Sequence, residues 1–180
     1  METRLFPDSE TFTTVRPKGL TDDQQLILYT KFASEIRKNK WSKSTIEEIV
    51  SDLKDINLND DGYEVAKKFE SRLLSGRYDI DTQFVEYLDC LSHEEDSIHR
   101  KNVKDWVKAH NIKPKYATGT MLIIDTTLNY HQKKGNTVYI NGLNKEEAYY
   151  LIHEDPDRKG GIVVPYEIVE ERCSVMATKK

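Results

Sequence analysis

The chain has 180 residues, of which 37% are hydrophobic and 32% charged, with a net charge of −4 and a sequence pI near 5.8. No apolar run approaches the ~18 residues that a membrane-spanning helix needs, and the first ten residues lack the apolar core of a signal peptide. Residues 1–110 carry a net charge of −5 and residues 111–180 a net charge of +1, which argues against a strongly basic nucleic-acid-binding domain.

The two cysteines, Cys90 and Cys173, are far apart in the sequence and do not form the spacing of a disulfide framework. A reducing, cytoplasmic environment is therefore expected. No membrane partner is expected either.

Residues 1–19 are predicted to be an extended arm. Pro7 and Pro17 disfavour a helix, and the threonines and valine between them favour extended backbone. The same composition also fits an edge strand or a disordered tail.

Residues 20–112 are predicted to form a helical domain of four to five helices. The first begins at Thr21, which has capping-box spacing with Gln24, and the second begins at Ser44, with Glu47 in the same relation. Each then shows an apolar face with helical spacing. The first face consists of Leu26, Tyr29, Phe32, Ala33 and Ile36, and the second of Ile46, Ile49, Val50, Leu53 and Ile56.

An acidic loop over residues 55–63 invites comparison with an EF-hand calcium site. Asn57, Asn59 and Asp61 fall at the first, third and fifth positions of such a loop, with Gly62 at the sixth. The twelfth position, which should supply a bidentate glutamate, is Lys68. The loop is therefore interpreted as a turn in which Asp61 caps the third helix.

Two further helix starts are expected. Asp81 is the predicted cap of a fourth helix, and Ser92 with Glu95 marks either a fifth helix or a continuation of the fourth. Pro114 closes the helical part. Helices of these lengths are typical of a compact bundle.

Residues 115–172 are predicted to form a small antiparallel β domain, which makes the fold class α+β. Strands are expected at 120–125, 137–140, 149–152 and 162–164, with a turn at Asn141-Gly142. A short helix is the alternative for residues 147–153. The spacing is similar in outline to an SH3-like barrel, or else to a curled sheet. Residues 173–180 are expected to be a flexible tail.

Tyrosines are concentrated in the β domain, where six of the ten occur after residue 115. Tyrosine is favoured at protein interfaces because it offers a large contact area with a polar tip. The predicted function is therefore that of a non-enzymatic binding or adaptor protein that recognises another protein. The predicted contact residues are Tyr139, Tyr149, Tyr150 and Tyr166. Core packing is the structural alternative for these side chains.

A row of basic residues offers an alternative function in nucleic-acid association. Spacings of three and four place several of them on one helix face, opposite an apolar face. The row consists of Arg100, Lys101, Lys104, Lys108, Lys113 and Lys115. Asp105 interrupts it, so a solvated helix face is the competing interpretation.

A third hypothesis is a metal-dependent enzyme centred on His93 and His99. Cys90, His93 and Asp96 are three residues apart, so a helix would place them on roughly one face. The spacing matches no defined metal site, and acidic residues at a helix start explain the same pattern. No metal ligand is assigned for that reason. No catalytic residue or cofactor is assigned either, because the chain has neither a phosphate-binding glycine loop nor a nucleophile elbow.

Overall fold

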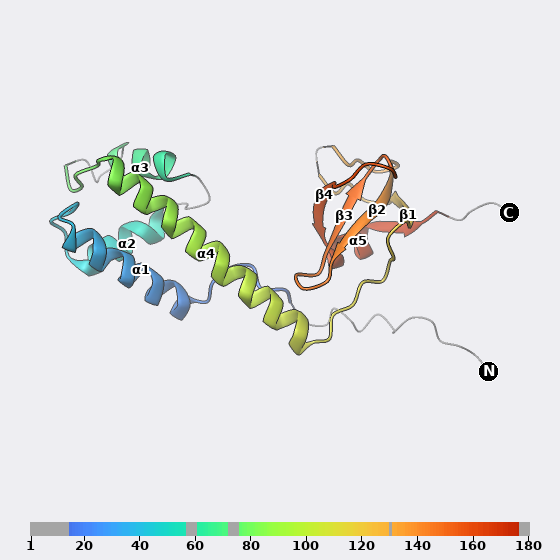
Figure 1. Ribbon diagram of the computed structural model, residues 1–180, viewed down its shortest axis with the longest axis horizontal. Coiled ribbons are helices and arrows are strands. Elements are labelled where there is room, and N and C mark those ends of the chain that lie inside the picture. The colour runs from blue at the N-terminus through green and yellow to red at the C-terminus, as the bar shows by residue number, and fades with distance from the viewer. Residues whose placement is uncertain (1–14, 57–60, 72–75, 130, 177–180) are drawn as a thin grey trace. The chain divides into compact units, whose positions relative to one another are not determined.

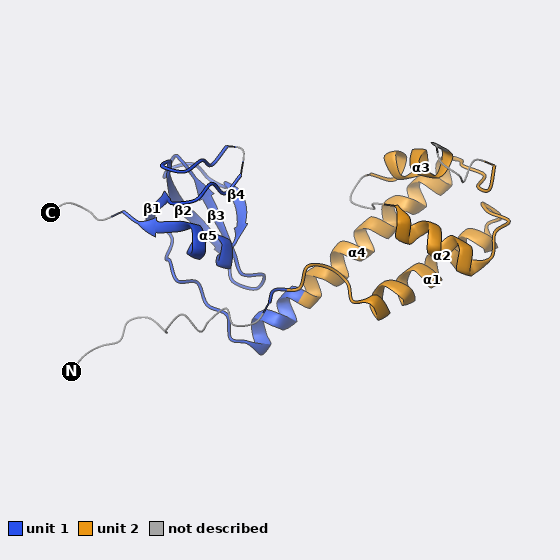
Figure 2. Ribbon diagram, turned by 180° about the vertical axis from the view of Figure 1, so that it is seen from behind, with its two compact units in different colours: residues 1–16, 103–180 blue, residues 17–102 orange. Residues whose placement is uncertain are grey.

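The computed structural model describes residues 15–56, 61–71, 76–129 and 131–176 (Figure 1). The chain divides into two compact units (Figure 2). Pro17–Asn102 form a helical unit, and Val103–Lys180 together with Met1–Arg16 form a sheet unit. The described part of the chain contains five helices and a five-stranded antiparallel sheet, which confirms the α+β class.

Four helices precede the sheet in the sequence. They are α1 (Asp22–Lys38), α2 (Ile46–Asp55), α3 (Gly62–Ser71) and α4 (Thr82–Ala109). The last is one continuous helix of 28 residues, so Ser92 and Glu95 lie inside it and the alternative of a separate fifth helix is wrong. The division between the units falls within α4, between Asn102 and Val103.

The predicted cap of α1 is confirmed. The Thr21 hydroxyl accepts a hydrogen bond from the Gln24 backbone N–H at 3.3 Å, and the Gln24 side chain accepts one from the Thr21 N–H at 3.0 Å. The two side chains thus satisfy donors that the first helical turn leaves free.

The predicted cap of α2 is wrong by one residue. Thr45 and Glu48 form the capping box, with distances of 3.2 and 2.8 Å. The Ser44 N–H instead donates to the Ser42 hydroxyl at 3.1 Å, while the Ser44 hydroxyl accepts from Arg77 Nε at 3.1 Å. Because these contacts engage Ser44 in the preceding turn, the helix begins one residue later.

Aspartates cap the next two helices as predicted. Asp61 Oδ1 accepts from the Glu64 N–H at 2.9 Å, and Asp81 Oδ1 accepts from the Phe84 N–H at 2.7 Å. The remainder of the acidic loop, residues 57–60, lies outside the described residues.

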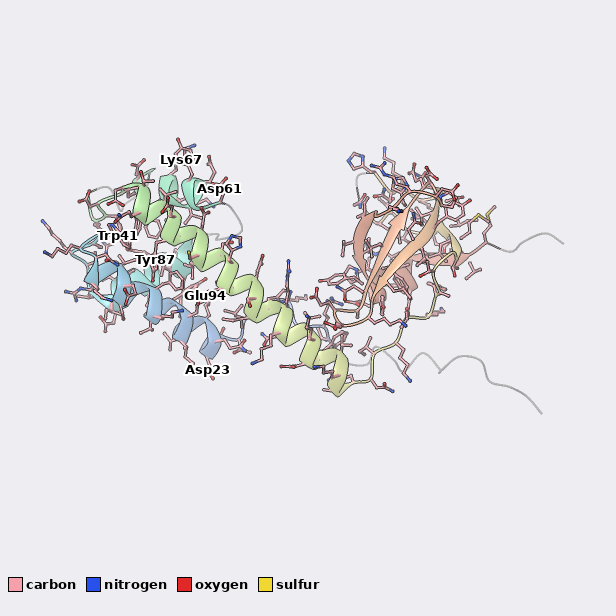
Figure 3. All side chains as sticks on the ribbon, in the orientation of Figure 1. Asp23, Trp41, Asp61, Lys67, Tyr87 and Glu94 are labelled. Atoms are coloured by element: carbon pink, nitrogen blue, oxygen red, sulfur yellow. The ribbon has the colours of Figure 1, made fainter. Side chains whose placement is uncertain are left out.

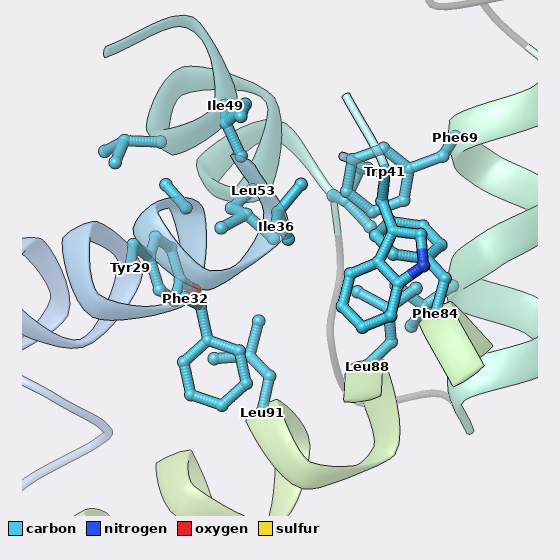
Figure 4. Packing of buried hydrophobic residues seen from close by; sticks show 14 of the residues in the cluster. Tyr29, Phe32, Ile36, Trp41, Ile49, Leu53, Phe69, Phe84, Leu88 and Leu91 are labelled. Carbon is cyan, nitrogen blue, oxygen red and sulfur yellow. The ribbon is translucent and has the colours of Figure 1, made fainter. Parts of the chain in front are cut away.

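The core of the helical unit contains the predicted faces of α1 and α2 (Figure 4). Phe32, Ile36, Ile49 and Leu53 are almost fully buried. Leu26 is an exception, since it is 48% exposed. Leu28 is buried in its place. Together with Tyr29, Phe32 and Ile36 it forms the side of α1 that faces the core.

The sheet has the spatial order β4-β3-β2-β1-β5. Its strands are β1 (Met121–Ile124), β2 (Thr137–Asn144), β3 (Tyr149–His153), β4 (Ile162–Pro165) and β5 (Cys173–Val175). Every pairing is antiparallel, and the two edge strands do not pair with each other. The sheet is therefore open, and the SH3-like barrel alternative is wrong.

Three local features of the sheet differ from the prediction. Asn141 and Gly142 do not form the predicted turn, because β2 continues to Asn144 with an irregularity between Ile140 and Gly142. Helix α5 (Tyr166–Arg172) follows Pro165 directly and was not predicted. Residues 173–175 form β5, which pairs with β1.

One face of the sheet packs into the core of the sheet unit. Alternate strand residues such as Leu122, Val138, Ile140 and Ile152 are fully buried. Figure 2 shows α5 on this unit beside the strands, and its Tyr166 and Val169 belong to the same core. Val103, Trp106 and Val107 from the end of α4 also join it.

Candidate functional site

The candidate site is the face of the sheet opposite the core, which we call the outer face. Side chains alternate between the two faces of a strand, so the residues between the buried ones point to this side. Its apolar residues are Met121, Ile123, Tyr139, Tyr149, Leu151 and Val163. All six are partly or largely exposed, and none belongs to either hydrophobic core.

Strand register brings these side chains next to one another. Met121 of β1 pairs with Tyr139 of β2, and Leu151 of β3 pairs with Val163 of β4. Directly paired side chains on one face of an antiparallel sheet lie in contact range. The outer face thus carries apolar groups across four strands.

Gly142 lies at the centre of this arrangement, paired with Leu151. A methyl group at Gly142 would lie only 3.0 Å from Leu151 Cδ1. The absence of a side chain on β2 therefore lets the Leu151 side chain lie over the backbone of its neighbour. Val163, on the edge strand beyond Leu151, is 57% exposed.

Two of the four predicted contact tyrosines lie on the outer face. Tyr139 and Tyr149 are each partly exposed there. Tyr149 is also covered by Arg16, whose Cζ lies 4.2 Å from the ring centroid. Tyr139 is therefore the more accessible aromatic group of the pair for a partner.

Tyr150 and Tyr166 lie in the core instead. Both are 0% exposed, and their ring centroids are 4.3 Å apart. The Tyr150 hydroxyl donates to Glu170 Oε1 at 2.6 Å and accepts from the Tyr116 N–H at 3.0 Å. Burial raises the pKa of Tyr166 to about 12 and also raises the pKa of Tyr150. A partner of the folded protein cannot reach either ring.

Sequence reasoning missed Arg16, which fixes the turn between β2 and β3. Its Nη2 donates to the Glu147 carbonyl at 2.5 Å and its Nη1 to the Ala148 carbonyl at 3.3 Å. Nη1 also lies 3.4 Å from a Glu167 carboxylate oxygen, and the side chain is only 12% exposed. A lone arginine before the first predicted helix forms no sequence pattern that would predict a contact with a distant turn.

The basic row is partly neutralised within the sheet unit. Lys104 Nζ lies 3.0 Å from Glu146 and 3.7 Å from Glu147. The pKa of Glu146 is lowered, chiefly by its hydrogen bond to Lys104 and also by Lys108. The other five side chains of the row, those of Arg100, Lys101, Lys108, Lys113 and Lys115, are exposed.

The residues around His93 mainly join helices. Glu94 lies on α4 (Figure 3), and both of its carboxylate oxygens accept from Lys31 Nζ of α1 at 2.8 Å. Cys90, His93 and Asp96 are exposed, and His99 is partly buried. Within the described residues, no three His, Cys, Asp or Glu side chains are grouped closely enough to hold a metal ion.

No protein-family model, curated protein or solved structure matches the chain. Among the described residues, no helix has the length and apolar character needed to cross a membrane. The function must therefore be inferred from the chain's own side chains.

Proposed function

We propose that this protein is a protein-binding module that contacts its partner through the outer face of the sheet. The observation that carries the proposal is the set of six neighbouring apolar side chains on the face turned away from the core. Exposed apolar groups that lie next to one another commonly mark a protein interaction site. A partner segment that covered them would remove their apolar surface from water, which favours association.

The chemistry of the outer face favours a protein over a nucleic acid. Its polar positions include Thr137, Asn144, His153 and Ser174, and neither lysine nor arginine lies on these strands. Affinity for nucleic acid depends mainly on lysine and arginine contacts to phosphates. An apolar segment of a protein, with an aliphatic or aromatic side chain placed between Tyr139, Leu151 and Val163, matches the face better.

A matched pair of substitutions tests the proposal. Val163 and Val175 are the same residue type, lie on opposite edge strands and are each 57% exposed. Val163 lies on the outer face, whereas Val175 pairs with Leu122, whose side chain points to the core side. Val163→Arg should abolish capture of a stoichiometric partner by the full chain, and Val175→Arg should leave capture unchanged.

Nuclease treatment distinguishes the alternative based on the basic row. A partner that remains bound after nuclease treatment and is lost with Val163→Arg supports the outer face. Material that disappears on nuclease treatment, and that Val163→Arg leaves unaffected, would instead favour nucleic-acid association through the basic row.

A further inference from the structure

The helical unit contains a polar cleft of about 360 Å³ that is separate from the outer face of the sheet. Lys18 and Gly19 precede α1, Tyr29 comes from α1, Lys54 from the end of α2, and His99 from α4. A volume of this size falls within the range of small-molecule sites, roughly 300–1,000 Å³. Four separate segments of the chain therefore contribute side chains to one small concavity.

Hydrogen bonds between its walls fix the shape of the cleft. Asn102 Nδ2 of α4 donates to the Gly19 carbonyl at 3.3 Å and to Gln24 Oε1 at 2.8 Å. A second bond joins α1 to α4, because the Tyr29 hydroxyl donates to Glu95 Oε1 at 2.5 Å. The segment before α1 and the helix α1 itself are thus both bonded to α4, so the cleft is preformed.

Tyr29 and Glu95 are hydrogen-bonded to each other. Burial of Tyr29, together with its hydrogen bond to the Glu95 carboxylate, raises the pKa of the phenol well above its ordinary value. Gln25 Nε2 donates to the same hydroxyl at 3.1 Å. The phenol therefore remains protonated and holds Glu95, which leaves the other lining groups to meet a ligand.

Three of these lining residues have a polar group without a partner among the described residues. His99 Nδ1 is shielded from solvent and makes no hydrogen bond to any residue that the structure describes, although a buried polar atom usually has one. Neither Lys18 nor Lys54 forms an ion pair with any residue that the structure describes. The two ammonium groups are donors that suit an oxygen-rich anion, and Nε2, the ring nitrogen of His99 that is not among the solvent-shielded atoms, is the one that a ligand in the cleft can meet.

We propose that the cleft binds a small molecule that carries an anionic group, a phosphate or a carboxylate, beside one or more hydroxyl groups. Lys18, Lys54 and His99 hold the anionic group. Asp96, an exposed acceptor that lines the same cleft, suits the hydroxyl. This assignment is independent of the outer face, because every group involved belongs to the helical unit.

Titration of the ¹⁵N-labelled full chain, at constant ionic strength, tests this site directly. The probes are glucose 6-phosphate for the phosphate source, malate for the carboxylate source and glucose as the neutral control. We expect at least one anion to give saturable amide shifts confined to residues 18–20, 54–56 and 95–99. Glucose should give none at the same concentration.

Two variants and a matched lysine control complete the test. Lys54→Gln and His99→Gln should each weaken binding about tenfold, because each removes a hydrogen bond to the anionic group. Lys43→Gln, at an exposed lysine that does not line the cleft, should leave affinity unchanged. The proposal is overturned if neither anion saturates, if glucose produces the same shifts, or if all three variants bind alike while retaining the wild-type spectrum.

Discussion

The Arg16 guanidinium stacks over the Tyr149 ring, with Cζ 4.2 Å from the ring centroid. The same group lies 5.7 Å from the Trp106 ring and donates to the Glu147 and Ala148 carbonyls. A residue that precedes α1 therefore closes the β2–β3 turn of the sheet unit. This explains why the sheet unit includes a segment from before the helices.

Arg16→Ala should weaken the sheet unit by about 3 kcal/mol. The substitution removes two charged hydrogen bonds to carbonyls and a cation–π contact, each of which contributes on the order of 1 kcal/mol. Amide hydrogen exchange should therefore become faster in β3 while α2 is unaffected, because exchange reports local opening. Arg37→Ala, at an exposed arginine of α1, is the control. Equal effects of both substitutions in β3 would contradict this role for Arg16.

Gly62→Ala should destabilise the helical unit by about 3 kcal/mol or more. A methyl group at Gly62 would overlap the Val85 carbonyl oxygen and lie 2.8 Å from Asp89 Oδ1, which accepts a hydrogen bond from the Gly62 N–H. Backbone atoms cannot yield to this overlap without separating α3 from α4. Urea denaturation measures the change. Gly19→Ala is the matched control, since among the described residues no atom other than those of Gly19 and its chain neighbours lies within 4 Å of its added methyl group.

Glu170 should make the sheet unit less stable as the pH rises. Burial raises the pKa of this carboxyl above its ordinary value of 4.5, against the lowering effect of its bonds from Tyr150 and Lys115. The folded protein therefore binds this proton more tightly than the unfolded chain, so the contribution of Glu170 to stability is fully present below pH 4.5 and is lost as the pH rises through the folded pKa.

Glu170→Gln should remove this loss of stability. The Gln side-chain oxygen can still accept from the Tyr150 hydroxyl and the Lys115 N–H, which both bond to Oε1 in the wild type. The variant should therefore be more stable than the wild type at neutral pH and show a flatter pH profile in thermal unfolding. Glu171→Gln, at the exposed neighbouring position, should keep the wild-type slope. A variant that is less stable at neutral pH would contradict this account of Glu170.

The two cysteines should react with a thiol reagent at very different rates. Cys90 is exposed, whereas Cys173 is buried and burial raises its pKa to about 11. One thiol per folded chain should therefore react rapidly at pH 8, and the second only after unfolding. In a Cys90→Ser variant, the rate at which Cys173 reacts then reports how often the sheet unit opens. Rapid reaction of that variant without denaturant would show that Cys173 is accessible.

Local sequence patterns predicted the elements of this fold better than their ends. Thr21, Asp61 and Asp81 were recognised as caps because the bonds they form lie within three residues. The α2 cap was misplaced because Ser42 and Arg77 engage Ser44, and Arg77 is distant in the sequence. The predicted Asn141-Gly142 turn was also wrong because of a residue distant in the sequence. Gly142 pairs with Leu151, so β2 continues past the predicted turn.

The candidate site was predictable only in part. Alternation correctly placed Tyr149 and Tyr150 on opposite faces of β3, but it could not tell which face was buried. That choice depends on α5 and on the end of α4, which cover one face. The partners of Lys104 likewise come from the β2–β3 turn, so its neutralisation could not be read from the spacing of the basic residues.

Site-specific photo-crosslinking tests the outer face most directly. A photoreactive phenylalanine analogue at position 163, on the outer face, is compared with the same group at position 175, on the opposite edge strand. We expect position 163 to form a covalent adduct with one defined protein in a lysate of the source organism, and position 175 to form none with that protein. Addition of excess unlabelled wild-type chain should suppress the adduct. No adduct at 163, or the same adduct at both positions, would contradict a partner bound on the outer face.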